Sequence, residues 1–315
     1  MSGEADFLRR LRAMVADPAA RGLADDVALI PTSGEQLVLT VDTLVEGVHY
    51  RADDPPERVG WKLAAVNLSD LAGKGATPKA CLLSYALSGD TAWDDAFLDG
   101  LAEALGAHAM PLVGGDTVAL PKGAPRVLTL TAIGAVPQGR AVPSRSGAQP
   151  GDFLYLSGPV GDAGAGLALL DDGRSEPEAL IDAYRKPCPY LMLGQALATD
   201  AHAMMDVSDG LLIDADRMAR ASECALVIEA IPLSADYVLL HGLSVESRLA
   251  AATAGDDYVL LAALPPDWAP PPGVIRIGHC AEGAGLSVVL EGRAVQLPAR
   301  LGYEHRADAG PESAP

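Results

Sequence analysis

Seven aspartates stand at the ends of predicted strands or the starts of predicted helices: Asp25, Asp26, Asp42, Asp70, Asp116, Asp206 and Asp209. If folding brings them together, their carboxylates cannot all be ionised without counter-charge. Oxygen ligands without His or Cys favour magnesium, manganese or calcium over zinc, and Mg2+ usually binds through one or two carboxylates plus substrate phosphates. The pattern therefore indicates several Mg2+ ions that clamp a polyphosphate, although any single aspartate at a turn could equally cap a helix.

Other phosphate-binding patterns are absent from the sequence. It contains no GxxxxGK[ST] loop and no HRD or DFG set. The glycine-rich pieces at 114–117 and 157–166 are weak indications of a backbone that approaches phosphate. Arg145 could reach a phosphate, and an interdomain salt bridge is the equally plausible alternative.

The segment 61–78, WKLAAVNLSDLAGKGATP, is predicted to be a helix over its first two-thirds. Asn67, Asp70 and Lys74 are spaced three and four apart, which puts them on one helical face. The glycines that follow loosen the helix, and Pro78 forbids its continuation. The polar face is either part of a site or a solvated stripe.

The chain is predicted to be α/β (α+β) with two domains. Its length of 315 residues suggests two units of roughly 150 residues each. Strands are expected at 36–43, 79–87, 110–113 and 126–136, and a long helix at 93–108. A cluster of Pro, Gly, Ser and Arg at 137–152 marks a boundary. We therefore expect an N-terminal domain at 1–138, a C-terminal α/β domain at 139–307 and a flexible tail at 308–315.

Composition excludes several partners. Forty-two acidic residues against 23 basic ones give a net charge of −19, which would repel nucleic acid and anionic membranes. The four cysteines form no CxxC and predict buried thiols in a reducing compartment. The charged N-terminal segment has no apolar signal-peptide core, and no apolar run reaches the roughly 18 residues of a membrane span. These features predict a soluble, cytoplasmic protein.

The ordered set of motifs resembles the thiamine-monophosphate kinase family, within the superfamily of aminoimidazole-ribonucleotide synthetase and selenide water dikinase. The resemblance rests on ADDVAL, TVDTLVEGVH, AVNLSDLAGKGATP, VGGDT, GRAVPSRSGAQPGD, MDVSDGL and GYEH, in order from about residue 20 to 305. It implies a two-domain synthetase-like fold whose N-terminal mixed sheet pairs across a homodimer near the active site. It also implies that ATP and thiamine monophosphate are converted to ADP and thiamine diphosphate, with several Mg2+ ions.

The resemblance also implies site residues, motif by motif. It assigns metal contacts to Asp26, Thr40, Val41, Asp42, Asp70, Asp116, Asp206 and Asp209, ATP contacts to Gly115, Asp116, Arg145 and Ser208, and substrate contacts to His49, Asp256 and Tyr303. Of these, Asp70, Asp116, Asp206 and Arg145 would be catalytic. Two positions depart from the family: Val41 replaces a Thr, so a metal contact there must use main-chain oxygen, and Asp256 replaces a Glu that is one methylene longer.

The chemistry is consistent with this assignment. A phosphate monoester has a second pKa near 6, so its oxygen is already a competent nucleophile at neutral pH without a general base. The obstacle is repulsion between two anions, which metal ions and Arg145 could overcome. We therefore expect direct in-line transfer without a phosphoenzyme. The alternatives are an aminoimidazole-ribonucleotide synthetase-like enzyme, a non-catalytic nucleotide-binding homologue and a metal-dependent phosphohydrolase.

Overall fold

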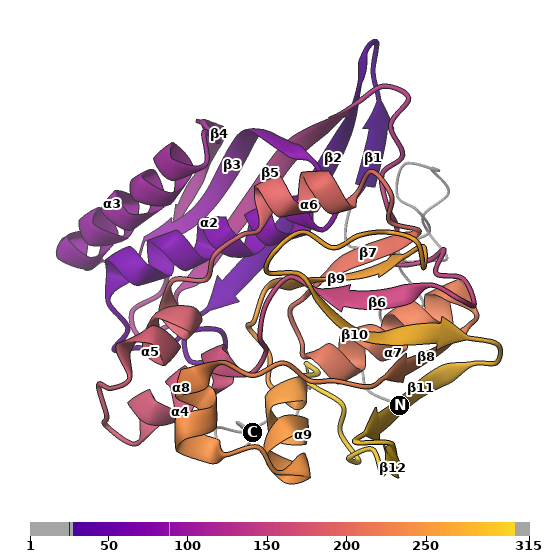
Figure 1. Ribbon diagram of the computed structural model, residues 1–315. Helices are drawn as coiled ribbons and strands as arrows, with labels where there is room; N and C mark the ends of the chain where they lie inside the picture. Colours follow the sequence, from indigo (N-terminus) through magenta and orange to yellow (C-terminus); the bar gives the residue numbers. More distant parts are fainter. Residues whose placement is uncertain (1–24, 26–27, 88, 306–315) are drawn as a thin grey trace.

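The structure is a computed structural model that describes residue 25, residues 28–87 and residues 89–305. Asp26, the charged N-terminal segment and the predicted tail at 308–315 lie outside these residues. The described chain forms two β-sheets with helices packed against them (Figure 1). The predicted mixed α/β fold is thus confirmed.

The first sheet has the strand order β1-β2-β5-β3-β4. Its strands are β1 (Ala28–Pro31), β2 (Glu35–Val45), β3 (Thr77–Leu87), β4 (Leu112–Ala119) and β5 (Val127–Pro137). Side chains along β2 alternate between faces, so Thr40 is buried while Val41 is exposed. One face of the sheet is therefore apolar and covered, and the other is open.

Helices α2 (Pro56–Ala72) and α3 (Thr91–Ala107) cover the buried face (Figure 1). Pro56 starts α2 at a position where its fixed φ suits the helix and its missing N–H costs nothing. The two helices approach closely, because a Cβ added to Gly100 would lie 1.8 Å from the Glu57 carbonyl oxygen. Phe97 of α3 is fully buried and contacts the Tyr85 ring of β3, which joins this helix to the sheet.

The second sheet has the strand order β12-β11-β8-β10-β6-β9-β7. Its strands are β6 (Phe153–Leu156), β7 (Ala203–Val207), β8 (Ala225–Ile228), β9 (Val259–Leu264), β10 (Ile275–Ala281), β11 (Gly285–Leu290) and β12 (Arg293–Val295). The helices of this half are α4 (Asp162–Asp171), α5 (Glu178–Arg185), α6 (Leu191–Leu197), α7 (Leu211–Ser222), α8 (Ala235–His241) and α9 (Val245–Thr253). Side chains of α7 share an apolar core with one face of the sheet, while the C-terminal end of α2 and helix α6 pack on the other.

The interval between β5 and β6 contains neither helix nor strand, and the predicted domain boundary falls in it. One strand differs from its prediction. We expected a strand at 110–113 that ends in Gly-Gly-Asp-Thr, but β4 begins at Leu112 and runs through this sequence to Ala119. The reason is tertiary: β4 pairs in parallel with β3 as far as Leu87, and this ladder overrides the local preference of two glycines for a turn.

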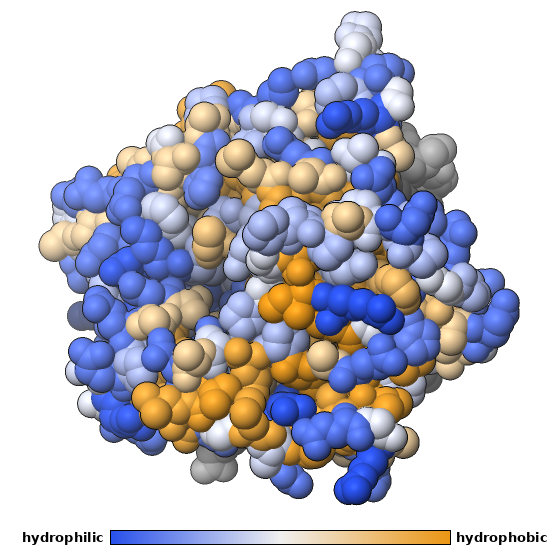
Figure 2. Space-filling model, viewed as in Figure 1, coloured by the Kyte–Doolittle hydropathy of each residue, from blue (hydrophilic) through white to orange (hydrophobic). Residues whose placement is uncertain are grey.

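Figure 2 shows where apolar side chains reach the surface on one face of the molecule. Hydrophobic residues gather over α8 and α9, where Leu239, Leu243 and Val245 are exposed. Among the described residues, no helix is long and apolar enough to cross a membrane.

Candidate functional site

Three carboxylates from distant parts of the chain meet where the two sheets adjoin, and we call Asp42, Asp70 and Asp206 the acidic cluster. Asp42 is on β2, Asp70 is on α2 and Asp206 is on β7. The Thr40 hydroxyl donates a hydrogen bond to Asp70 Oδ2, and the Ser69 hydroxyl donates to Asp206 Oδ2 at 2.7 Å. Each of these two carboxylates is therefore oriented by a hydroxyl donor.

The end of α2 positions this cluster because it packs against β7. A Cβ added to Gly73 would lie 3.1 Å from the main-chain nitrogen of Asp206, so any larger residue there would require β7 to shift by a few tenths of an ångström. Asn67 is fully buried; its Oδ1 accepts the Asp42 main-chain N–H at 3.2 Å, and its Nδ2 donates to the Leu63 carbonyl at 2.9 Å. The polar face of the helix is thus no solvated stripe, because Asn67 is 0% exposed.

Lys74 follows the same helix and is 1% exposed. Its Nζ donates to Asp25 Oδ1 at 2.7 Å and to the Met204 carbonyl at 3.2 Å. It also lowers the pKa of both Asp70 and Asp206, against the larger effect of burial. Lys74 therefore supplies part of the counter-charge for the acidic cluster.

The electrostatics of the acidic cluster show that this counter-charge is insufficient. Burial, with a smaller contribution from the Asp209 carboxylate and against a hydrogen bond with Asp70, raises the pKa of Asp42 to about 6. Burial followed by repulsion from Asp42 and Asp206 raises the pKa of Asp70 well above its ordinary value. Burial also raises the pKa of Asp206, and Asp42 adds to this rise against the Ser69 hydrogen bond.

Such carboxylates fit divalent cations, because only further positive charge or protons can relieve their repulsion. The donor set consists of carboxylate, hydroxyl and main-chain oxygens, which suits Mg2+. Within residues 25, 28–87 and 89–305, no three acidic, histidine or cysteine side chains are already arranged around one metal position. The metal assignment therefore rests on the chemistry of these oxygen donors and not on a preformed set of ligands.

A second charged group, which consists of Asp209, Asp214 and Arg217, follows β7 directly. The main-chain N–H groups of Ser208 and Asp209 both donate to Asp214 Oδ2 at 3.1 Å, which holds the turn at the start of α7. Arg217 Nη1 donates to both Asp209 and Asp214, and burial raises the pKa of Asp214 to about 7 against this arginine. Burial lowers the pKa of Arg145, which lies within the electrostatic reach of Asp25 and Asp214.

Gly115 and Asp116 are not brought to the acidic cluster within one copy of the chain. Asp116 lies on β4 and pairs with Ser84 of β3. Ser84 pairs in turn with Thr129 of β5, and Thr129 pairs with Thr43 of β2. Three strand spacings of about 4.8 Å separate β4 from β2, and the alternation of side chains puts Asp116 on the open face. Asp42 and Asp70 are on the helix-covered side of the same sheet.

The predicted substrate contacts lie close to the second charged group: Asp256 and Tyr303 bond to the main chain of residues 208 and 209, and His49 is near Tyr303 through His305. The main-chain N–H of Tyr303 donates to the Asp209 carbonyl at 2.9 Å, and that of Asp256 donates to the Ser208 carbonyl at 2.8 Å. The ring centres of His49 and His305 are 5.4 Å apart, and those of His305 and Tyr303 are 5.0 Å apart. Burial, then His305, lowers the pKa of His49 to about 4, so this imidazole is neutral at pH 7.

Sequence reasoning missed several of these residues. Lys62, Ser69, Asp214 and Arg217 were not expected in the site, and each bonds to a residue that was. Lys62 was detectable in principle, because a lysine among Trp, Leu, Ala and Val must either reach solvent or find a partner. It is 2% exposed, and its carboxylate partner, Asp256, lies 194 residues further along the chain.

Comparisons with known proteins show which family and fold this chain resembles. Residues 24–136 match the N-terminal domain of AIR synthase related proteins, and residues 149–270 match their C-terminal domain. The chain is 38% identical over 307 residues to the thiamine-monophosphate kinase of Caulobacter vibrioides, covering 92% of this chain and 86% of that protein.

Two solved structures are similar over nearly the whole chain. AaThiL complexed with AMPPCP and TMP has a TM-score of 0.86 and 30% identity, covering 96% of this chain and 97% of that one. The thiamine-monophosphate kinase from Stenotrophomonas maltophilia K279a has a TM-score of 0.75 and 35% identity, covering 92% and 96%.

Proposed function

This chain belongs to the thiamine-monophosphate kinase family, and we propose that it transfers the γ-phosphoryl group of ATP directly to the phosphate of thiamine monophosphate. The observation that carries the proposal is the acidic cluster. Burial raises the pKa values of three carboxylates from β2, α2 and β7, and repulsion from Asp42 adds to the rise at both Asp70 and Asp206, so cations would stabilise the ionised form of this cluster. A polyphosphate with its cations is the ligand that such a site suits.

The cation-binding residues in this proposal are Asp26, Thr40, Asp42, Asp70, Asp116, Asp206 and Asp209, with the main-chain oxygen of Val41. When bound, Mg2+ supplies the positive charge that lets two anionic phosphates approach each other. Ser69 and Thr40 orient their carboxylates by donating hydrogen bonds. Gly115, Arg145 and Ser208 are the proposed nucleotide contacts, and Arg145 remains charged to face developing negative charge.

No residue has to remove a proton from the acceptor. The second pKa of a phosphate monoester is about 6, so the attacking oxygen is largely deprotonated at pH 7. We therefore propose in-line displacement with inversion at phosphorus and no phosphorylated side chain. The His49 imidazole binds the substrate and takes no part in the transfer.

We also propose a homodimer formed by the open face of the first sheet. This face carries exposed Val41, Leu82 and Val118, at 58%, 40% and 52% exposure, in rows set by the strand register. An exposed apolar sheet face of this kind typically marks a protein interface. Because Asp116 is on this face, we propose that it serves the acidic cluster of the partner subunit.

Mixing two inactive variants tests this arrangement. Asp70→Asn and Asp116→Asn, each inactive alone, should regain up to about a quarter of the wild-type activity when their subunits are exchanged, because mixed dimers contain one intact site. If Asp116 serves the site of its own chain, the mixture stays inactive. Sedimentation of the unmixed variants checks that both remain dimers.

Phosphorus NMR tests the activity itself. The protein is incubated with ATP and Mg2+, with and without thiamine monophosphate. Thiamine diphosphate and ADP that appear only with the acceptor establish the kinase. Phosphate release regardless of acceptor would indicate a phosphohydrolase, and binding without turnover would indicate a non-catalytic homologue.

A further inference from the structure

The proposed substrate contacts His49 and Asp256 come from different halves of the chain and are joined by one buried lysine. Lys62, on α2, is 2% exposed. Its Nζ donates to Asp256 Oδ2 at 2.7 Å and to the His49 carbonyl at 3.1 Å, and it lies 4.0 Å from the centre of the Tyr184 ring. The ammonium group therefore has a carboxylate, a carbonyl and an aromatic face as partners, which compensates for its burial.

Asp256 is also held from a second side. The Tyr258 hydroxyl donates to Asp256 Oδ1 at 2.9 Å. Both residues have positive φ, at 66° for Asp256 and 52° for Tyr258, a region that costs a non-glycine residue about 1 kcal/mol or more. The Tyr258 main-chain N–H donates to the Val207 carbonyl at 2.8 Å, so β7 helps to hold the strained loop. Each carboxylate oxygen of Asp256 thus has one fixed donor and one lone pair left for a ligand.

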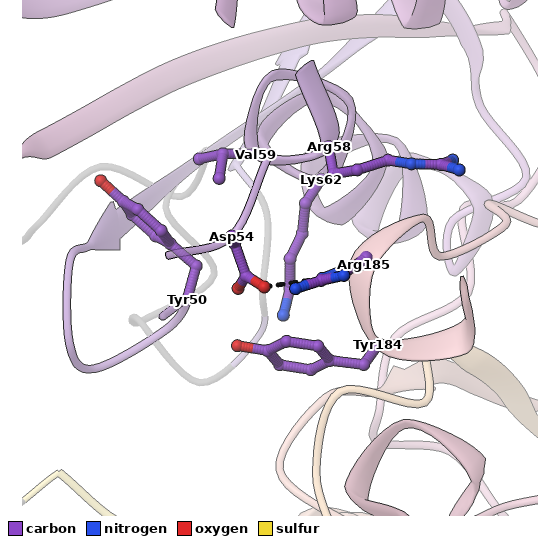
Figure 3. A pocket seen from close by; sticks show the side chains of 7 residues that line it. All are labelled: Tyr50, Asp54, Arg58, Val59, Lys62, Tyr184 and Arg185. Carbon is purple, nitrogen blue, oxygen red and sulfur yellow. Dashed lines mark hydrogen bonds and ion pairs between the residues drawn. The ribbon is translucent and has the colours of Figure 1, made fainter. Parts of the chain in front are cut away.

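The His49 side is equally restrained. Its Nδ1 accepts the Val45 main-chain N–H at 3.0 Å, which leaves the proton of the neutral ring on Nε2. The loop after His49 is joined to α5 by Asp54, whose Oδ1 accepts from Arg185 Nε at 2.7 Å; Asp54 is 4% exposed. Figure 3 shows Lys62 reaching past this ion pair toward the Tyr184 ring.

We propose that Lys62 is a positioning residue for the organic part of the acceptor substrate. It sets the spacing between a donor, His49 Nε2–H, and an acceptor, the Asp256 carboxylate, while remaining too buried to touch the ligand. An amino-substituted heteroaromatic ring, which offers an acceptor nitrogen beside an exocyclic amino group, presents the complementary pair. Lys62 and Tyr258 also compensate for the short Asp256 side chain by holding its carboxylate in one place. This inference rests on the proposed function and on the substrate contacts assigned there.

The test separates the Michaelis constants of the two substrates. Lys62→Met keeps an unbranched side chain but removes the charge and its hydrogen bonds. We expect the KM for thiamine monophosphate to rise about tenfold, which corresponds to the loss of roughly one hydrogen bond to a charged group. The kcat and the KM for ATP should stay within about twofold, because an interaction made equally in the ground and transition states changes only binding. Lys79→Met, which removes an exposed lysine paired with Glu35, is the control and should change neither constant.

A double-mutant cycle identifies the route of the effect. If Lys62 acts through Asp256, then Lys62→Met combined with Asp256→Asn should bind thiamine monophosphate no more weakly than Asp256→Asn alone. Tyr258→Phe, which keeps Lys62, should raise the same KM by a smaller factor and provides the measurement if Lys62→Met fails to fold.

Three outcomes would overturn the inference: an unchanged KM for thiamine monophosphate in Lys62→Met, an equal rise in both Michaelis constants, or additive losses in the double variant. Where Lys62→Met does not fold, an unchanged KM for thiamine monophosphate in Tyr258→Phe would overturn the inference instead. If the wild-type protein transfers no phosphoryl group, the proposed function fails by itself. The affinity of the same variants for thiamine monophosphate, measured by calorimetry, then decides the role of Lys62 separately.

Discussion

Two groups of charged side chains lie near the junction of the two sheets, and they differ in how their charges are balanced. In the acidic cluster, like charges from β2, α2 and β7 repel one another, and Lys74 offsets only part of the repulsion. Around Lys62, the ammonium group, the Asp256 carboxylate and the Tyr258 hydroxyl satisfy one another. In the function that we propose, the first group is completed by an external cation, whereas the groups around Lys62 already satisfy one another within the chain.

This contrast has a physical consequence. Neutralising one carboxylate of a group of like charges relieves their repulsion but removes a ligand for the cation. Removing one member of a satisfied ion pair leaves the other charge buried without a partner. Loss of function and loss of stability should therefore separate in the first group and coincide in the second.

Asp70→Asn should produce the largest effect. We expect activity to fall by at least about 10³-fold, or ~4 kcal/mol in transition-state stabilisation. The free energy of unfolding without divalent cations should rise, because a repelled carboxylate has become neutral. Kinetics and thermal unfolding in a chelator measure the two effects, and an active Asp70→Asn protein would contradict the site.

Asp54→Ala tests a buried pair beside Lys62. Arg185 would be left without its 2.7 Å partner, and we expect a loss of about 3 kcal/mol in the free energy of unfolding. Asp53→Ala removes the neighbouring, exposed carboxylate and should cost less than about 0.5 kcal/mol. Urea unfolding compares the two variants, and equal losses would argue against the distinction between them.

Adding Mg2+ should stabilise the wild-type protein and not Asp70→Asn. At a concentration about 100 times the dissociation constant, cation binding contributes about 2.7 kcal/mol. The melting temperature should accordingly rise by several degrees and return when a chelator is added. A matched increase in ionic strength with NaCl is the control, and an equal response from both salts would remove the evidence for a specific cation site.

His49→Gln should produce the smallest effect on stability, and this effect should be visible only in acid. The unfolded chain takes up this proton below about pH 6.5, but burial lowers the pKa of His49 to about 4 in the folded protein. Stability therefore falls as the pH drops through this window, and the substitution should reduce that fall by an amount on the order of 1 kcal/mol after allowance for partial exposure. Unfolding of the wild-type protein and of the variant, followed from pH 7 to pH 4, measures this difference.

Much of the architecture could be predicted from local pattern. Strands such as β2 and β5 alternate apolar and polar residues and were expected near their observed bounds. Apolar residues at helical spacing also predicted α2, although it begins at Pro56, five residues before the predicted start at Trp61. The involvement of Asp42, Asp70 and Asp206 was also predictable as a hypothesis, because each stands among small apolar residues in a short motif.

The course of β4 was not predictable in this way. Two glycines before Asp116 favour a turn locally, yet pairing with β3 continues the strand and moves Asp116 to the open face of the sheet. Strand pairing joins residues far apart in sequence, and its energy exceeds the local preference of single residues. A residue assigned by motif can therefore end up on the opposite face from its expected partners.

The sequence by itself determined which elements form and which acids could do chemistry, since helix and strand periodicity and residue type are local properties. Only the tertiary structure decided that Lys62 meets Asp256, 194 positions further along the chain, and that Asp116 leaves the acidic cluster of its own copy. Burial requires a lysine or a carboxylate to have a partner, but the packing of distant segments selects which partner it has.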